Sequence, residues 1–373
     1  MRIGVPREIK DHEDRVGMVP GAVHELVAHH GHEVIVEHDA GRNIGLLDED
    51  YVAAGARIAP DAETVWAQAD MIVKVKEPQP AERARLRADQ ILFTYLHLAP
   101  DAAQTRDLMD TGATCIAYET VTSPSGALPL LMPMSEVAGR MAVQVGAHCL
   151  ENAQGGPGIL LGGVAGVPPA HVVILGGGVS GTNATLMAVG LGADVTVVDR
   201  SPDALRRIIA TFGTRVKTAF STRDTISQLL PQADLVIGTV LVPGAAAPKL
   251  ITRAMLGTMR PGSVIVDVAI DQGGCAETSH ATTHTNPTYV LDGITHYCVA
   301  NMPGGVARTS TFALNNATLP YIAALADKGW RKALADDPHL RAGLNVQGGG
   351  VTHSAVARAL GLALRPVDDV LAG

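Results

Sequence analysis

Short apolar runs alternate with helix-length stretches along the first third of the chain. The apolar runs predict strands at residues 2–5, 33–37, 70–75, 91–95 and 114–117. The stretches between them predict helices at residues 21–29, 48–54, 62–68 and 101–109. Strands and helices that alternate at this spacing are typical of βαβ units and a mainly parallel sheet.

The same alternation resumes at His171 and continues through the second half of the chain. It predicts strands at residues 172–175, 194–198, 215–219, 235–238 and 263–268. Helices are predicted at residues 179–191, 203–211, 222–230, 251–258, 310–326 and 353–360. Because 373 residues are enough for two domains, we expect an α/β protein with two doubly wound, Rossmann-like domains, mainly parallel sheets and a cleft between the domains.

The segment between the two blocks has a different pattern. A loop rich in Ser, Gly and Pro covers residues 123–134, and a long helix is predicted at 136–152 with Ser135 as its N-cap. The Gly-rich stretch 155–168 has two apolar runs around Gly162 and Gly163. This arrangement favours a hairpin over a flexible linker.

Composition narrows the classes of function. The net charge is −8, aromatic residues make up 3%, and no Lys/Arg cluster occurs, so we expect no nucleic-acid partner. No apolar run approaches the ~20 residues of a membrane span. The four cysteines are far apart, as free thiols of a reducing compartment are, and the N-terminal residues lack a signal-peptide layout. We therefore expect a cytoplasmic protein.

The strongest motif is the glycine-rich segment 176–181, Gly-Gly-Gly-Val-Ser-Gly, which follows a predicted strand and opens an apolar helix. In a dinucleotide-binding turn, Gly176 would permit the tight turn and Gly178 would let the backbone approach a pyrophosphate. Gly181 would let the helix pack closely on the strand, with the phosphate at the helix N-terminus. The alternative is an ordinary Gly-rich turn between a strand and a helix.

Asp199 supports the dinucleotide interpretation, because it ends the next predicted strand 23 residues after Gly176. An acid at this position accepts hydrogen bonds from ribose hydroxyls and repels a 2′-phosphate, which favours NAD over NADP. Arg200 follows directly and is the one neighbouring feature that weighs against this preference.

Three titratable residues of the first block follow predicted strands: Arg15, Lys76 and His97. Ligands of open α/β sheets bind beyond the carboxyl ends of the strands. An Arg and a Lys suit a small carboxylate, and a His moves protons near neutral pH. Strand alternation places Lys74 on the same face as Lys76. Spacing alone equally allows a solvated Arg, a Lys with a buried stem and a hydrogen-bonded His.

Two further acids, Asp267 and Asp271, lie where a predicted strand of the second block runs into a loop. A carboxylate there could polarise a water or hold an ammonium, but either acid could instead cap a turn. His29, His30 and His32 lie at a predicted helix end, where a cation complements the helix dipole, and we assign them no function.

Together, these motifs resemble the alanine dehydrogenases nearly from end to end. The shared segments are 15–16, 70–78 (with Lys-Val-Lys-Glu-Pro), 90–98, 116–121, 133–140 (Pro-Met-Ser-Glu-Val-Ala-Gly-Arg), 233–249, 266–275 and 297–303. The nearest related families are the NAD-binding subunits of proton-pumping transhydrogenases and the lysine-forming saccharopine dehydrogenases. The joint presence of Arg15, Lys76, His97 and Asp271 favours the alanine enzymes.

The resemblance implies a role for each of these residues. Arg15 and Lys76 would bind the substrate, His97 would be the general acid/base, and Asp271 would assist at the reacting carbon. In addition to the glycines, the residues implied to line NAD are Ser135, Asp199, Ser221, Val240, Leu241, Val268, Ala269, Ile270, Asp271, Val299, Ala300, Asn301 and Met302. The implied domains are 1–129 with 308–373 for the substrate and 130–307 for NAD, in a homohexamer.

Two positions depart from the family pattern. Some members bind magnesium through a position matched by Glu119 and a His that appears here as Lys328, so we predict no metal. A basic residue often found near the cofactor appears as His280, which would weaken a phosphate contact.

The implied reaction is reversible: L-alanine, NAD⁺ and water give pyruvate, ammonium, NADH and a proton. Three alternatives stay open. They are a transhydrogenase-type NAD(H)-binding subunit, an opine- or lysine-type dehydrogenase, and a non-catalytic NAD-binding scaffold.

Overall fold

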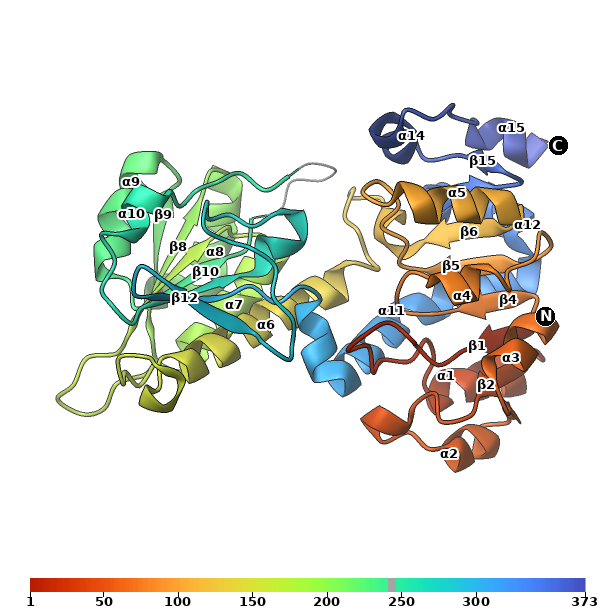
Figure 1. The fold of residues 1–373 in the computed structure, drawn as a ribbon, viewed down its shortest axis with the longest axis horizontal. Helices are drawn as coiled ribbons and strands as arrows, with labels where there is room; N and C mark the ends of the chain where they lie inside the picture. The colour runs from red at the N-terminus through yellow and green to blue at the C-terminus, as the bar shows by residue number, and fades with distance from the viewer. Residues whose placement is uncertain (241–245, 373) are drawn as a thin grey trace. The chain divides into compact units, whose positions relative to one another are not determined.

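The computed structural model describes residues 1–240 and 246–372, which form two compact units. Unit 1 combines Met1–Met134 with the residues from Val306 onward, and unit 2 is Ser135–Gly305. Each unit is a sheet with helices packed against it (Figure 1). In the described part of the chain, no helix has the length and apolar character needed to span a membrane.

The unit 1 sheet has eight strands in the order β15-β14-β6-β5-β4-β1-β2-β3. All neighbours from β3 to β6 pair in parallel, whereas β14 pairs antiparallel with both β6 and β15. The order of the parallel strands reverses between β1 and β4, which is the switch point of a doubly wound sheet. The strands are β1 (Arg2–Val5), β2 (Glu33–Glu37), β3 (Arg57–Ala59), β4 (Met71–Val73), β5 (Ile91–Thr94), β6 (Thr114–Ala117), β14 (Leu344–Gln347) and β15 (Gly350–Val351).

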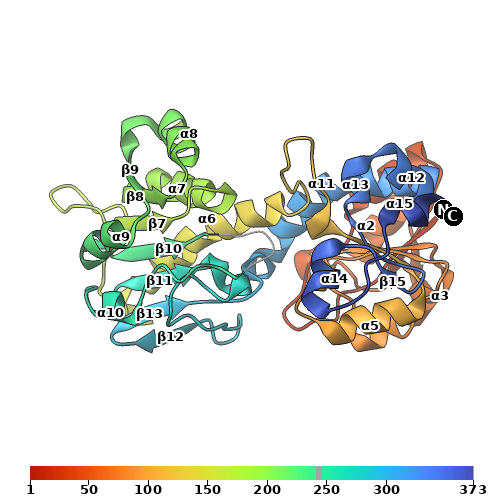
Figure 2. The ribbon, with the colours of Figure 1, turned by 90° about the horizontal axis from the view of Figure 1, so that it is seen from above.

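The helices of unit 1 come from both ends of the chain. The N-terminal set is α1 (Pro20–His24), the π-helix η1 (Glu25–His29), the 3-10 helix η2 (Arg42–Ile44), α2 (Asp48–Ala53), α3 (Ala62–Gln68), α4 (Pro80–Arg83), α5 (Ala102–Thr111) and the 3-10 helix η3 (Tyr118–Thr120). The C-terminal set is α11 (Ala307–Lys328), α12 (Trp330–Asp336), α13 (Pro338–Arg341), α14 (Ser354–Leu360) and α15 (Val367–Ala372). Figures 1 and 2 both place α14 beside β15.

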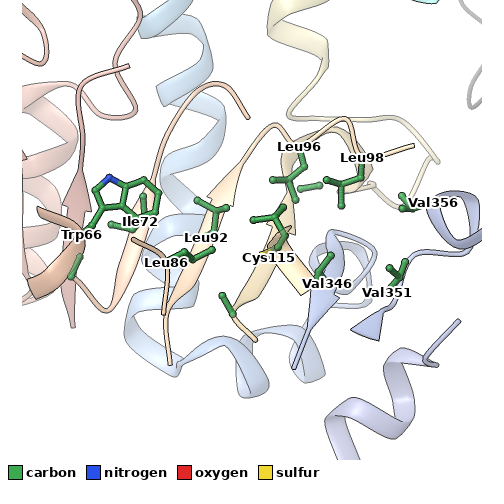
Figure 3. Close-up of a cluster of buried hydrophobic side chains, with 14 of the residues drawn as sticks. Trp66, Ile72, Leu86, Leu92, Leu96, Leu98, Cys115, Val346, Val351 and Val356 are labelled. Atoms are coloured by element: carbon green, nitrogen blue, oxygen red, sulfur yellow. The ribbon is translucent and has the colours of Figure 1, made fainter. Parts of the chain in front are cut away.

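A core on one face of this sheet joins the two ends of the chain (Figure 3). Trp66 of α3 and Leu92 of β5 belong to the same buried cluster as Val346 of β14 and Val356 of α14. Because burial of apolar surface is the dominant stabilising term, this cluster makes the C-terminal segment part of the first unit.

The unit 2 sheet has seven strands in the order β12-β13-β11-β10-β7-β8-β9, reversing between β7 and β10. Among the strands of the described residues of unit 2, β12 alone is antiparallel, and it pairs with β13. The strands are β7 (His171–Leu175), β8 (Asp194–Asp199), β9 (Val216–Phe220), β10 (Leu235–Gly238), β11 (Val264–Asp267), β12 (Thr288–Leu291) and β13 (Ile294–Tyr297). The helices are α6 (Met132–Cys149), α7 (Val179–Gly190), α8 (Pro202–Phe212), α9 (Arg223–Leu229), α10 (Arg253–Leu256) and the 3-10 helices η4 (Asn152–Gln154), η5 (Gly213–Arg215), η6 (Leu230–Gln232), η7 (Val268–Gln272) and η8 (Met302–Val306).

The predicted α/β class with mainly parallel sheets is confirmed, but several local predictions were wrong. The helix predicted at 136–152 begins at Met132, so Ser135 lies inside α6 and is not its N-cap. The hairpin predicted at 155–168 is reduced to an isolated antiparallel bridge between Val164 and Val167. The strand predicted at 70–75 ends at Val73, so Lys74 and Lys76 do not share a strand face.

Candidate active site

The glycine-rich turn between β7 and α7 has the geometry expected of a dinucleotide-binding turn. Gly176 has a φ of +110°, a left-handed conformation that side chains rarely adopt. A Cβ on Gly181 would lie 1.8 Å from the carbonyl oxygen of Gly176, so only glycine allows α7 to pack this closely. A Cβ on Gly178 would meet nothing within 4 Å. The backbone of Gly178 is therefore open to a ligand at the start of α7.

The carboxylate of Asp199 is held beside this turn. Oδ2 accepts a hydrogen bond from the backbone N–H of Gly177 at 2.6 Å, and Oδ1 accepts one from the N–H of Ser201 at 2.7 Å. A carboxylate has about four lone-pair positions, so two remain for hydroxyl groups. Arg200 is exposed and directly follows β8. The turn thus holds an acceptor with spare capacity next to the open backbone of Gly178.

The other predicted cofactor residues of unit 2 share one location, because each segment follows a parallel strand. Ser221 follows β9, Val240 follows β10, residues 268–271 follow β11, and residues 299–302 follow β13. These positions therefore lie at the carboxyl edge of the same sheet, where open α/β sheets bind ligands. Ser135 belongs to α6, and its carbonyl oxygen accepts a hydrogen bond from Ser180 Oγ in the glycine-rich turn at 2.9 Å. Leu241 lies outside the described residues.

The two acids after β11 have different environments. Asp267 is fully buried and accepts hydrogen bonds from the backbone N–H of Ala269 at 3.1 Å and of Cys275 at 2.8 Å. Ser279 Oγ donates a third hydrogen bond to Asp267, at 2.5 Å. Asp267 is therefore the acid that caps the turn. Asp271 is exposed in η7, which leaves it as the chemically accessible carboxylate of the pair.

Arg15 lies in the loop after β1 and is buried with Glu13. Arg15 Nε and Nη2 donate to Oε1 and Oε2 of Glu13, each at 2.6 Å, while Nη1 lies 3.0 Å from Met134 Sδ. Burial lowers the pKa of Arg15, but the hydrogen bonds and charge of Glu13 raise it above its ordinary value. The guanidinium is therefore charged and held in a fixed plane.

The two lysines that follow β4 have separate roles. Lys74 is fully buried, with Nζ 2.9 Å from Glu8 Oε2 and 2.7 Å from Glu82 Oε1. Burial lowers the pKa of Lys74, but the two carboxylates raise it above its ordinary value. Lys76 is half-buried, and its carbonyl oxygen accepts a hydrogen bond from Thr94 Oγ1 at 3.0 Å. Lys74 belongs to a buried ion cluster, whereas Lys76 is only half-buried.

His97 follows β5 in a strained conformation. Its φ is +48°, which is uncommon for a residue other than glycine and is found often at functional sites. Glu119 accepts hydrogen bonds from the backbone N–H of His97 at 2.7 Å and of Leu96 at 3.2 Å. The His97 ring stacks on Tyr95, with the ring centres 5.7 Å apart and the planes within 5°. The imidazole is 43% exposed, and its Nδ1 lies 3.9 Å from Glu119 Oε1.

Arg15, Lys76 and His97 follow three adjacent parallel strands, β1, β4 and β5, on both sides of the switch point. A cavity of about 360 Å³ opens over the loop after β1, and Arg15 and Glu13 belong to its lining. Sequence reasoning missed Glu13 and assigned no positioning role to Glu119. Glu13 lies two residues before Arg15, and this spacing could have predicted that the two side chains form an ion pair.

The positions that depart from the family pattern also have defined contacts. Lys328 Nζ lies 2.9 Å from Asp336 Oδ2, and Glu119 holds the backbone before and at His97. His280 stacks on Tyr289, with the ring centres 3.7 Å apart.

Comparisons with known proteins cover nearly the whole chain. Residues 4–138 match the model of the alanine dehydrogenase/PNT N-terminal domain, and residues 142–354 match that of the C-terminal domain. The alanine dehydrogenase of Halomonas elongata is 62% identical over 362 residues, which cover 97% of each chain. A solved L-alanine dehydrogenase has a TM-score of 0.94 and 53% identity, covering 97% of this chain and 99% of its own. A transhydrogenase structure from Sinorhizobium meliloti has a TM-score of 0.81 and 27% identity, covering 95% and 100%.

Proposed function

Because this chain belongs to the alanine dehydrogenase/PNT family, we propose that it catalyses the NAD-dependent, reversible oxidative deamination of L-alanine to pyruvate and ammonium. The observation that carries this proposal is the identity of 53–62% to alanine dehydrogenases over nearly the full length of both chains. The transhydrogenase structure is far less similar, at 27% identity. The enzyme is an oxidoreductase acting on a CH–NH₂ group.

Unit 2 fits NAD. The open backbone of Gly178 at the start of α7 suits a pyrophosphate, since free N–H groups and the helix dipole favour an anion there. Asp199 keeps acceptor capacity for two ribose hydroxyls. Ser221, Val240 and the segments 268–271 and 299–302 would complete the binding edge. When bound, the nicotinamide accepts the hydride that leaves the α-carbon of alanine.

Unit 1 supplies the groups that bind the substrate. Arg15 would hold the substrate carboxylate through its guanidinium, of which Nε and Nη2 already donate to Glu13, because a fixed guanidinium makes charge-assisted hydrogen bonds to carboxylates. The Lys76 ammonium would bind the carbonyl oxygen of pyruvate, or the hydroxyl oxygen of the carbinolamine, and stabilise the negative charge that develops on that oxygen. Glu13 fixes the plane of the Arg15 guanidinium, and its negative charge offsets the positive charge of Arg15.

His97 would move the protons of the reaction. The ammonium group of alanine first loses a proton, so that hydride loss from the neutral amine gives an iminium ion, and water must then add to it and lose a proton to give a carbinolamine. The collapse of the carbinolamine then needs a proton on the departing nitrogen. An exposed imidazole can take up and release protons in both steps, and Glu119 and Tyr95 would hold its position. Asp271 would stabilise the ammonium that forms.

The remaining parts of the proposal concern organisation. We assign residues 1–129 with 308–373 to substrate binding and 130–307 to NAD. We also assign the enzyme to the cytoplasm as a homohexamer and include no metal in the mechanism.

One assay tests the proposed function. NADH oxidation is followed with pyruvate, with and without ammonium, and then NAD⁺ reduction is followed with L-alanine. We expect NADH oxidation only when pyruvate and ammonium are both present, and we expect NAD⁺ reduction with L-alanine. Equally fast NADH oxidation with pyruvate alone would indicate a lactate-type reaction. No turnover in either direction would favour an NAD(H)-binding subunit or a scaffold protein. Either result would overturn the proposal.

A further inference from the structure

Two histidines that we assigned no function meet an aspartate at the edge of unit 1. His30 Nδ1 lies 2.9 Å from Asp327 Oδ2, and His32 Nε2 lies 2.9 Å from Asp327 Oδ1. The two imidazole rings are nearly parallel, with centres 6.2 Å apart. One ligand atom of each residue lies within 4.8 Å of the other two. Two imidazoles and one carboxylate thus converge on a single small volume.

The backbone explains why these side chains meet. The π-helix η1 ends at His29, and Gly31 has a φ of +71°, which turns the chain before β2 begins at Glu33. This turn places both imidazoles on the same side. Asp327 lies in the last turn of α11, almost three hundred residues later in the sequence. The C-terminal end of a helix favours a cation, so the field of α11 adds to the charge of Asp327.

The environment resembles that of a metal ligand set rather than an isolated ion pair. Zinc binds imidazole nitrogen and carboxylate oxygen at about 2.0–2.2 Å, so its ligand atoms lie a few ångströms apart, as these do. Metal-bound histidines usually have a partner on the second ring nitrogen. Here, Glu25 Oε1 lies 3.9 Å from His30 Nε2, and the α-amino group of Met1 lies 3.3 Å from His32 Nδ1. The Glu25 carboxylate therefore faces the second nitrogen of His30 as an acceptor, whereas the α-amino group faces the second nitrogen of His32 as a donor.

A second cluster of the same residue types provides a contrast. His38 Nδ1 faces Asp48 while His38 Nε2 faces Asp39, so opposite sides of one ring are engaged. Asp48 Oδ1 also accepts the backbone N–H of Asp39 at 3.0 Å, which is the geometry of a capped turn. The cluster of His30, His32 and Asp327 differs because two separate rings direct one nitrogen each toward the same carboxylate.

We propose that His30, His32 and Asp327 bind one divalent transition metal of the zinc class. The metal replaces the proton that each imidazole donates to Asp327. At His32, the metal takes Nε2 and the ring proton moves to Nδ1, so the imidazole binds as its neutral tautomer. Asp327 is 41% exposed and His30 is 29% exposed, so water can reach the metal and complete its coordination. The metal then joins the turn before β2 to the end of α11.

The test uses the full-length protein after treatment with a chelator. Zn²⁺ is titrated by calorimetry, and Co²⁺ is added separately because its visible spectrum reports coordination number and ligand type. We expect one saturable site per chain with nitrogen and oxygen ligands. His30→Ala, His32→Gln and Asp327→Asn are each expected to weaken Zn²⁺ binding by at least about tenfold. Zn²⁺ is also expected to raise the Tm of the wild type but not of these variants.

Matched controls separate this site from other metal-binding groups. His29→Ala removes a neighbouring imidazole that is 61% exposed, and His38→Ala disrupts the second cluster; neither is expected to change Zn²⁺ affinity. Circular dichroism and the Tm of each metal-free variant show whether it folds. Affinity that is unchanged in folded His30→Ala and His32→Gln would overturn the proposal, as would a sulfur-to-cobalt band, because all four cysteines are buried. Activity without metal is expected to be unchanged, so this test is independent of the proposed function.

Discussion

The side chains of Arg15 and Glu13 form a buried, bidentate ion pair within one loop of unit 1. Two donor nitrogens of Arg15 lie 2.6 Å from the two carboxylate oxygens of Glu13, and the side-chain exposures are 2% and 0%. The pair fixes the guanidinium plane and offsets much of the charge that Arg15 presents to an anion. In the proposed mechanism, Arg15 is therefore both a substrate contact and half of a buried pair.

These two roles of Arg15 can be separated. Arg15→Met leaves the Glu13 carboxylate buried without its cation and is expected to lower the free energy of unfolding by about 3–5 kcal/mol. Adding Glu13→Leu removes the second charge and is expected to restore most of this stability, but not the pyruvate KM. Urea denaturation and steady-state kinetics check both points. A double variant with wild-type pyruvate KM would exclude Arg15 from substrate binding.

Replacing Lys74 is expected to affect mainly stability, whereas replacing Lys76 is expected to affect mainly the pyruvate KM and turnover. Lys76→Ala should raise the pyruvate KM and slow turnover, by the equivalent of about 1–3 kcal/mol, with little loss of stability. Lys74→Ala leaves Glu8 and Glu82 buried without their cation and should lower the free energy of unfolding by about 3–5 kcal/mol. Equal effects of both variants on stability and KM would contradict the assignment of Lys76.

His97→Ala is expected to lower kcat by ~10²–10⁴, because a general acid/base is lost. NADH affinity, measured by fluorescence, should stay near the wild-type value, since we propose that unit 2 binds the dinucleotide. Tyr95→Phe is the matched control: it keeps the ring that stacks on His97 and removes only the hydroxyl that donates to the Leu130 carbonyl. Near wild-type turnover of His97→Ala would remove His97 from the mechanism.

Asp199→Ala is expected to narrow the preference for NADH over NADPH, because the repulsion of a 2′-phosphate is removed. The backbone N–H groups of Gly177 and Ser201 also lose their acceptor, so NADH affinity itself should fall. Asp199→Asn keeps an acceptor for one of them without the charge and should retain more NADH affinity than Asp199→Ala. Kinetics with both cofactors measure these effects, and a wild-type preference for NADPH would contradict the prediction.

The buried carboxyl of Glu8 is expected to make stability depend on pH. Burial raises the pKa of Glu8 from 4.5 to about 6, although Lys74 opposes this rise. The folded protein thus keeps a proton on Glu8 where the unfolded chain has released it. The stability associated with this proton is complete below pH 4.5 and is lost as the pH rises through about 6, by on the order of 2 kcal/mol. Urea denaturation between these pH values should show this fall in the wild type, and a Glu8→Gln variant with the same pH slope would contradict it.

The sequence alone determined the features that depend on neighbouring residues. The pattern of apolar and polar residues predicted β1, β2, β6, β10 and α3 with their observed bounds. The spacing of Gly176, Gly181 and Asp199 predicted a turn whose geometry needs glycine at the first two positions and has a carboxylate at its side. Local patterns suffice here because each of these features depends on a short stretch of backbone and the face that it buries.

The tertiary structure decided which of several similar residues is available for chemistry. Lys74 and Lys76 have the same chemistry in sequence, but Lys74 is buried between Glu8 and Glu82, whereas Lys76 is half-buried. Asp267 and Asp271 are likewise separated by the N–H of Cys275 and the hydroxyl of Ser279, which bind only Asp267. The pairing of β14 with β6 and the meeting of His30 with Asp327 also join distant segments. Contacts between such distant segments determine which charged groups pair and which are buried. The pattern of apolar residues along the chain therefore cannot predict this pairing or burial.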